Sequence, residues 1–147
     1  PPVSQETMQP ALEALRDERP QVRREVAFAL GEWLGEGDDH LLDVLKLMAR
    51  DDPDAPTRAA AVEALGKAGG PEAVQILKLT LFNDVNEDVR AQALSVLADL
   101  LAHTEPNDDA IPDIIAQIRQ VGESDPSWYV RQLAQGALES TSGSWGV

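Results

Sequence analysis

The sequence contains no cysteine, which excludes disulfides, thiol catalysis, zinc–thiolate sites and iron–sulfur clusters. It also lacks long hydrophobic runs: none approaches the ~18 consecutive apolar residues that a membrane-spanning helix requires. Residues 1–10 have neither the basic start nor the apolar core of a secretory signal peptide. Together these absences predict a cytoplasmic protein without membrane insertion.

Basic residues are scarce as well. Nine Arg and three Lys stand against 26 Asp and Glu, and the formal net charge is −14. A field of this sign repels phosphate backbones, so no nucleic acid is expected among the partners. The acidity itself has three explanations, namely a basic partner, a source rich in internal salt, or solubility, and the sequence does not separate them.

No set of residues with the pattern of a catalytic or metal site is found. His40 and His103 are each isolated, and the glycines form no loop that would cradle a phosphate. Adjacent carboxylates occur at expected helix ends, where negative charge complements a helix N-terminus. We therefore expect no enzyme activity, no catalytic residue, no metal and no cofactor. The carboxylate pairs are Asp38-Asp39, Asp51-Asp52 and Asp108-Asp109.

An internal repeat is the main signal in the chain. Four times an Asp precedes an Arg by six residues, and the four Arg are spaced 35, 32 and 41 residues apart. After each Arg comes an Ala-rich apolar segment, as in a helix that packs closely on another helix. The pairs are Asp17 and Arg23, Asp52 and Arg58, Asp84 and Arg90, and Asp125 and Arg131.

The start of each Ala-rich helix can be placed from its capping residue. Asp54, Asn86 and Ser127 stand four residues before the repeated Arg, and such short polar side chains accept a bond from a free helix N–H. In the first repeat Arg19 occupies this position, and Pro20 follows where a missing N–H costs nothing. The spacing therefore predicts helices that begin just after these residues.

A second helix is expected in each repeat, before the Asp. We predict these helices at about 5–16, 39–50, 71–82 and 111–121, with turn residues such as Gly69 and Gly70 between them. The predicted fold class is all-α: a right-handed α-solenoid (α–α superhelix) of about four helical hairpins, with eight helices and no strand. The whole chain, 1–147, would form one domain, with repeats over about 5–139 and a loose tail at 140–147.

The motif Asp-x5-Arg followed by Ala-x-x-Ala-Leu-Gly, as in Ala61 to Gly66, resembles the HEAT-like repeats first named in phycobilisome lyase subunits. The resemblance extends from about Gln5 to Leu138 and implies a HEAT/armadillo-type solenoid. Family members include scaffolds, bilin lyases and metal-binding hydroxylases, whose His-Glu pairs are missing here. The sequence also departs from the motif at Ala98, where Gly is usual.

The repeated Asp and Arg favour a structural role over ligand binding. One Arg per repeat at a constant helical position would form a row, in which each guanidinium meets the Asp of its own or the next repeat. The planar fork of Arg suits this because it bonds a carboxylate at two points. We expect these eight residues, named here the Asp–Arg ladder, to shape the repeat.

The second helices carry the candidate binding face. Counted back from the next repeated Arg, two positions of each of these helices are predicted to be core, while another stripe carries a cation in every repeat. The predicted core residues are Leu42, Leu45, Val74, Leu77, Ile115 and Ile118. This stripe could form a partner-binding groove for an acidic or amphipathic protein segment. Alternatively, its cations pair with acidic residues of neighbouring helices and their stems cover apolar surface. The candidate groove residues are Lys46, Leu47, Arg50, Gln75, Lys78, Leu79, Phe82, Arg119 and Gln120.

Two further expectations follow. Trp33 and Trp128 are predicted to pack over the ends of the core, because terminal repeats must cover it. For function we expect a protein–protein interaction scaffold or adaptor. The alternative is a subunit of a bilin-lyase-like or chaperone-type factor that acts on a tetrapyrrole-bearing protein, as the resemblance implies.

Overall fold

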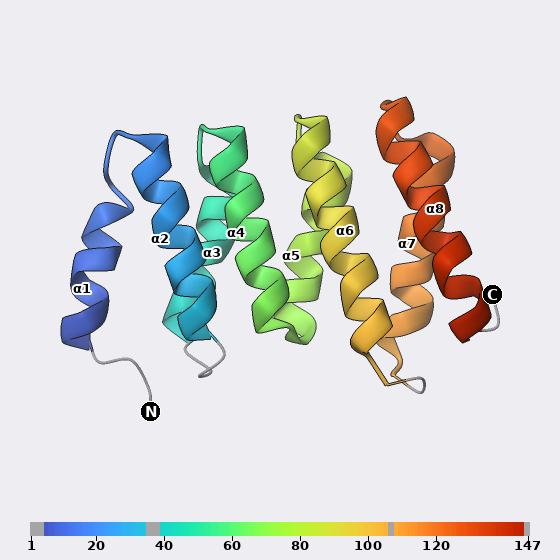
Figure 1. The fold of residues 1–147 in the computed structure, drawn as a ribbon, viewed down its shortest axis with the longest axis horizontal. Coiled ribbons are helices and arrows are strands. Elements are labelled where there is room, and N and C mark those ends of the chain that lie inside the picture. Colours follow the sequence, from blue (N-terminus) through green and yellow to red (C-terminus); the bar gives the residue numbers. More distant parts are fainter. Residues whose placement is uncertain (1–4, 35–38, 106–107, 146–147) are drawn as a thin grey trace. The chain divides into compact units, whose positions relative to one another are not determined.

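The computed structural model describes residues 5–34, 39–105 and 108–145. Within these ranges the chain forms eight α-helices and no strand, as predicted, and no helix is long and apolar enough to cross a membrane. Each predicted second helix coincides with an observed one. In chain order (Figure 1) the helices are α1 Gln5–Ala14, α2 Pro20–Trp33, α3 Asp39–Asp51, α4 Ala55–Ala68, α5 Gly70–Asn83, α6 Glu87–His103, α7 Ala110–Ser124 and α8 Trp128–Trp145.

The chain divides into two compact units. Unit 1 is Pro1–Ala73 and holds α1 to α4, whereas unit 2 is Val74–Val147 and holds most of α5 together with α6 to α8. In unit 1, α4 packs against both α2 and α3. In unit 2, α8 packs against both α6 and α7. Each unit is thus built of helical hairpins that pack on their neighbours.

Leucine, isoleucine and valine fill the core of each unit. A fully buried side chain of this kind contributes roughly 1.5–3 kcal/mol relative to an exposed one. Of the six core residues predicted on the second helices, Leu45, Leu77, Ile115 and Ile118 are buried, whereas Leu42 and Val74 are half-buried at the margin of the core. The other large, fully buried side chains include Leu30, Leu41, Val62 and Leu65 in unit 1, and Leu81, Val89, Leu94, Leu97 and Leu101 in unit 2.

Small residues set how closely α2 approaches α4. A Cβ atom placed on Gly31 would lie 2.8 Å from the Cβ atom of Ala64 and 3.0 Å from its Cα atom. Both distances are below van der Waals contact, so the Gly and Ala of the repeat motif permit this packing. At the junction of α4 and α5, Gly69 and the first residue of α5, Gly70, adopt φ angles of 62° and 81°, which favour glycine.

The helix starts follow the capping residues. Asp54, Asn86 and Ser127 each accept a hydrogen bond from backbone N–H groups in the first turn of the following helix. Arg19 makes no such side-chain bond, and Pro20 occupies the first turn of α2. The prediction of helix starts from these four positions is confirmed.

Two expectations are wrong. The helix α8 ends at Trp145, so residues 140–145 continue a helix instead of forming a loose tail; residues 146–147 lie outside the described part. The side chain of Trp128 does not pack over the core, because 68% of its surface is exposed. Arg24 of α2 is half-buried, and its Nε has no hydrogen-bond partner among the described residues. Trp33 is also half-buried.

Candidate functional site

The six-residue spacing of the Asp–Arg ladder follows from a turn that the Arg closes. In all four repeats the Nη1 group of the Arg donates a hydrogen bond to the backbone carbonyl oxygen of the Asp six residues earlier. The bonds run from Arg23 to Asp17 at 2.8 Å, Arg58 to Asp52 at 2.9 Å, Arg90 to Asp84 at 2.8 Å, and Arg131 to Asp125 at 2.6 Å.

The side chain of the Asp stabilises the same turn by accepting a backbone hydrogen bond. Its carboxylate accepts a hydrogen bond from the backbone N–H two residues later, an arrangement that stabilises a turn just before a helix. The four donors are the N–H groups of Arg19 at 2.8 Å, Asp54 at 2.9 Å, Asn86 at 2.9 Å and Ser127 at 2.8 Å. Each ladder residue therefore contributes to the local turn of its own repeat.

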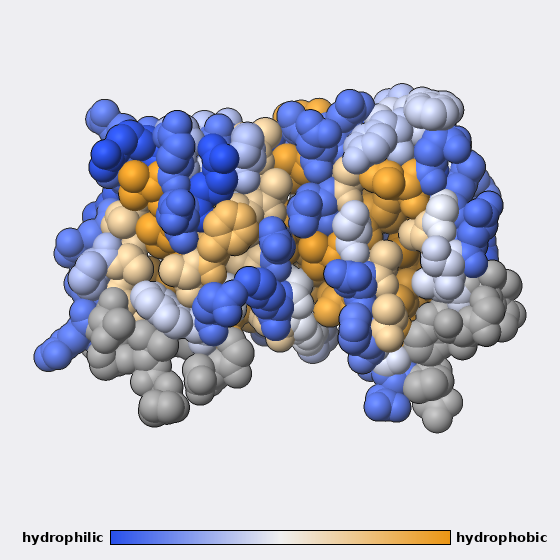
Figure 2. Space-filling view, in the orientation of Figure 1, coloured by the Kyte–Doolittle hydropathy of each residue, from blue (hydrophilic) through white to orange (hydrophobic). Residues whose placement is uncertain are grey.

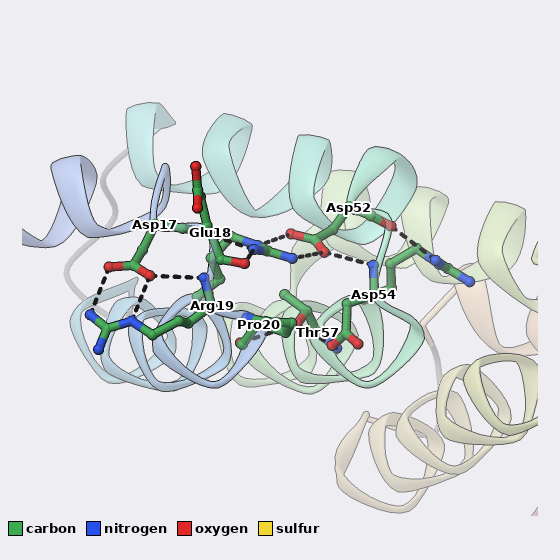
Figure 3. Close-up of polar contacts among 9 residues, drawn as sticks. Asp17, Glu18, Arg19, Pro20, Asp52, Asp54 and Thr57 are labelled. Atoms are coloured by element: carbon green, nitrogen blue, oxygen red, sulfur yellow. Dashed lines mark hydrogen bonds and ion pairs between the residues drawn. The ribbon is translucent and has the colours of Figure 1, made fainter.

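Within each unit, the fork of one Arg joins two successive repeats. Nε and Nη2 of Arg23 donate to both carboxylate oxygens of Asp52, at 2.9 and 3.0 Å (Figure 3), and this hydrogen bonding raises the pKa of Arg23. Arg90 bonds Asp125 in the same two-point geometry and at the same distances. Both pairs are nearly shielded from solvent, with Arg90 and Asp125 at 7% and 8% exposure. These contacts are those expected of a structural ladder.

Asp17, the first carboxylate of the ladder, is bonded within its own repeat. Nε and Nη2 of Arg19 each donate to it at 3.0 Å, so Arg19 bonds this carboxylate as Arg23 bonds that of Asp52 (Figure 3). The side-chain and backbone hydrogen bonds from Arg19 lower the pKa of Asp17 to about 2.

The two lysines of the candidate groove lie in ion pairs with carboxylates of neighbouring helices. Lys46 donates to Glu72 at 2.9 Å, and this bond raises the pKa of the lysine. Lys78 donates to Asp113, and this bond lowers the pKa of the aspartate. In both cases a lysine on one second helix meets a carboxylate on the next second helix, which is the alternative that the sequence left open.

A sequence signal for these acceptors exists and was missed. Glu72 precedes Arg90, and Asp113 precedes Arg131, by the same 18 residues. The two acceptors thus occupy one repeat position, just as the lysines do. An alignment of the repeats on their Arg residues shows this shared position, but only the structure shows that the lysines reach it.

The apolar residues of the candidate groove are exposed. Leu47 is 52% exposed, Leu79 49% and Phe82 37%, so none of them belongs to the core. Arg119 is exposed as well and makes no hydrogen bond or ion pair with the described residues. Arg50 is exposed, and its fork is bonded to the neighbouring Asp51.

The candidate residues are divided between the units. Unit 1 carries one group on α3, and unit 2 carries the other on α5 and α7, where Lys78 of α5 is bonded to Asp113 of α7. The unit 1 group is Lys46, Leu47 and Arg50, and the unit 2 group is Gln75, Lys78, Leu79, Phe82, Arg119 and Gln120.

Large apolar side chains are also exposed at the helix starts of unit 2, where the sequence had suggested no site. Val85 is 93% exposed and Tyr129 47%, in addition to Trp128. Elsewhere in the described chain, no three His, Cys, Asp or Glu side chains gather in a way that could hold a metal ion.

Tandem helical hairpins joined by Asp–Arg bonds define a helical-repeat protein. The family model for HEAT repeats matches residues 8–98, more than half of the chain, and the chain belongs to this family. No curated protein matches it. HEAT repeats generally mediate protein–protein interaction and are typically scaffolds without enzyme activity. The narrower relation to phycobilisome lyase subunits, with its tetrapyrrole alternative, stays a prediction of the resemblance.

Proposed function

We propose that the protein is an interaction scaffold that holds an acidic or amphipathic protein segment on the exposed face of its second helices. The face has the composition that a protein partner needs, with exposed apolar side chains beside cations. The group on α5 and α7 in unit 2 is the larger of the two and carries the proposal. The group on α3 in unit 1 offers a smaller face of the same chemistry.

The single observation that supports this face best is the exposure of Leu79 and Phe82. Their neighbours Leu77 and Leu81 are fully buried. The helix α5 therefore packs one apolar face into the core and exposes a second apolar face to solvent. Covering an exposed Leu or Phe contributes roughly 1.5–3 kcal/mol when the burial is complete. Two such side chains on adjacent turns of one helix are spaced to receive apolar residues of one partner segment.

Charge decides which partner fits. Lys78 is already bonded to Asp113, so it offers only part of its charge to a ligand. Arg119 has no such bond among the described residues, and its fork can bond a carboxylate at two points. We therefore assign the affinity to Leu79 and Phe82, and the choice of an acidic segment to Arg119. A charge at such an exposed position acts mainly on the association rate and its salt dependence.

The test is selection of binders from a random library of helical peptides on the wild-type protein. The selected peptides are expected to combine carboxylates with apolar residues at helical spacing. Leu79→Ala with Phe82→Ala should weaken their binding by about tenfold or more, because ~1.4 kcal/mol already corresponds to that factor. Arg119→Glu should slow association strongly at low salt and weakly at high salt.

The matched control is Phe28→Ala, which removes a similarly exposed aromatic residue of α2 in unit 1, a helix that is not one of the second helices. It should leave the affinity of the peptides unchanged. Selected peptides that bind the Leu79→Ala and Phe82→Ala variant as tightly as the wild type would disprove the proposal.

A further inference from the structure

Unit 2 exposes a second set of large apolar side chains, separate from the second-helix face. Val85 lies in the turn before α6, and Trp128 and Tyr129 form the first two residues of α8. Their exposed fractions are 93%, 68% and 47%. We call this set, with the exposed carboxylates Glu87 and Asp88 at the start of α6 and Glu123 at the end of α7, the turn-edge patch.

The two turns that carry the patch are clamped together by one buried guanidinium. Nη1 of Arg90 donates to the backbone carbonyl of Asp84, the residue before Val85. The fork of Arg90 bonds the carboxylate of Asp125, which also accepts the N–H of Ser127, the residue before Trp128. The patch therefore stands on backbone that is fixed by hydrogen bonds.

The helix starts that carry the turn-edge patch lie close to one another in the fold. The starts of α6 and α8 lie at the same edge of unit 2, the upper one in Figure 1. Figure 2 shows a pale surface of intermediate hydropathy over the start of α8, at the upper edge of the unit. Exposed aromatic residues on rigid backbone are the usual anchors of protein interfaces, since little conformational freedom is lost when they bind.

The repeat architecture does not require aromatic residues at these positions. Aligned on the repeated Arg, the other three repeats have small or polar residues there, each exposed or half-buried. These two repeat positions are therefore at least partly exposed in every repeat, and only the last repeat carries aromatic residues at them. The counterparts of Trp128 are Pro20, Ala55 and Glu87, and those of Tyr129 are Gln21, Pro56 and Asp88.

The charges around the patch point to a basic ligand. Glu87, Asp88 and Glu123 are exposed, whereas the cations of the same edge are engaged: Arg90 is buried against Asp125, and the half-buried Arg131 donates Nη1 to the carbonyl of Asp125. The ring face of Trp attracts a guanidinium or ammonium group, and nearby carboxylates add to the attraction. Acidic and aromatic side chains together complement Lys and Arg.

We propose that the turn-edge patch binds a Lys/Arg-containing segment of a partner protein, with a cation of that segment over the ring of Trp128 and others paired with Glu87, Asp88 and Glu123. This surface goes beyond the second-helix face and selects the opposite charge. The two faces would let one chain hold two segments of different chemistry.

The experiment uses a fluorescein-labelled peptide of alternating Arg and Gly as the probe, with binding to the whole chain followed by fluorescence anisotropy. Trp128→Gln with Tyr129→Ala is expected to weaken binding by about tenfold, and Glu87→Lys with Asp88→Lys by a similar factor. The charge-reversed pair should also reduce the salt dependence of binding, because fewer opposite charges meet.

Matched controls separate this patch from the general acidity of the chain. Phe28→Ala removes an exposed aromatic residue in unit 1, Glu63→Lys reverses an exposed charge there, and both should leave the affinity within about twofold of the wild type. The Leu79→Ala, Phe82→Ala variant should also bind the probe with wild-type affinity. That result would distinguish the turn-edge patch from the second-helix face. Circular dichroism verifies that each variant keeps its helices, and Tyr129→Ala alone provides a milder variant.

Equal affinity for the wild type and the Trp128→Gln, Tyr129→Ala variant would overturn the proposal. So would an equal loss of affinity in Glu63→Lys and in Glu87→Lys with Asp88→Lys, because the probe would then respond to net charge alone. Failure of the wild type to bind the probe would also overturn it.

Discussion

Removal of Arg90 tests the ladder at its most buried pair. Arg90→Ala deletes both bonds to the carboxylate of Asp125 and the bond to the backbone carbonyl of Asp84. In the wild type only 5% of the Asp125 side chain is exposed, and after the substitution its carboxylate keeps the hydrogen bond from the N–H of Ser127 but has lost its counter-charge. A buried charge that has lost its counter-charge is the most costly outcome of such a substitution.

The expected loss of unfolding free energy is about 3–5 kcal/mol, the range found when one partner of a buried ion pair is removed. Arg50→Ala is the matched control, because Arg50 and Asp51 form a two-point pair with side chains that are 69% and 58% exposed. An exposed pair of this kind contributes about 0–1 kcal/mol. The contrast between the two variants therefore isolates the effect of burial.

The assay is urea unfolding followed by circular dichroism. With a urea slope of ~2 kcal/mol per molar, the expected loss moves the midpoint of Arg90→Ala down by roughly 1.5–2.5 M. The midpoint of Arg50→Ala should move by less than about 0.5 M on the same slope. Arg90→Met combined with Asp125→Leu should recover much of the stability, since it removes both charges and keeps apolar volume.

The reasoning would be refuted if Arg90→Ala and Arg50→Ala shifted the midpoint equally. It would also be refuted if the double variant were less stable than Arg90→Ala, because the loss would then come from packing and not from a stranded charge.

Gly31→Ala should destabilise unit 1 by about 1–3 kcal/mol in thermal or urea unfolding, because the new methyl group would meet Ala64 at 2.8 Å. Gly136→Ala, in α8, should stabilise by about 0.5–1 kcal/mol, since open space surrounds that position and alanine suits a helix better; loss of stability there would contradict this. Arg19→Ala should raise the pKa of Asp17, measured by NMR, from about 2 toward 3.8. Because the folded-state pKa is lowered, the pair stabilises the fold above about pH 3.8 and this contribution disappears as the pH falls toward 2, a dependence that Arg19→Ala should lack.

Much of the repeat could be predicted because its determinants are local. The Asp, the capping residue and the Arg lie within six residues, and they bond to backbone groups of the same turn. Helical periodicity placed Leu77 in the core and Leu79 and Phe82 outside it, since the phase of a helix follows from its apolar positions alone.

The sequence by itself determined the helical hairpins, their starts and the turn that each Asp and Arg share, because these depend on contacts along one short stretch of chain. Only the tertiary structure decided which carboxylate Lys46 and Lys78 meet, since Glu72 and Asp113 lie on neighbouring second helices. It also decided that Trp128 is exposed. The surroundings of a residue at a helix start depend on how the preceding turn joins the next repeat, and no pattern within a single helix encodes that.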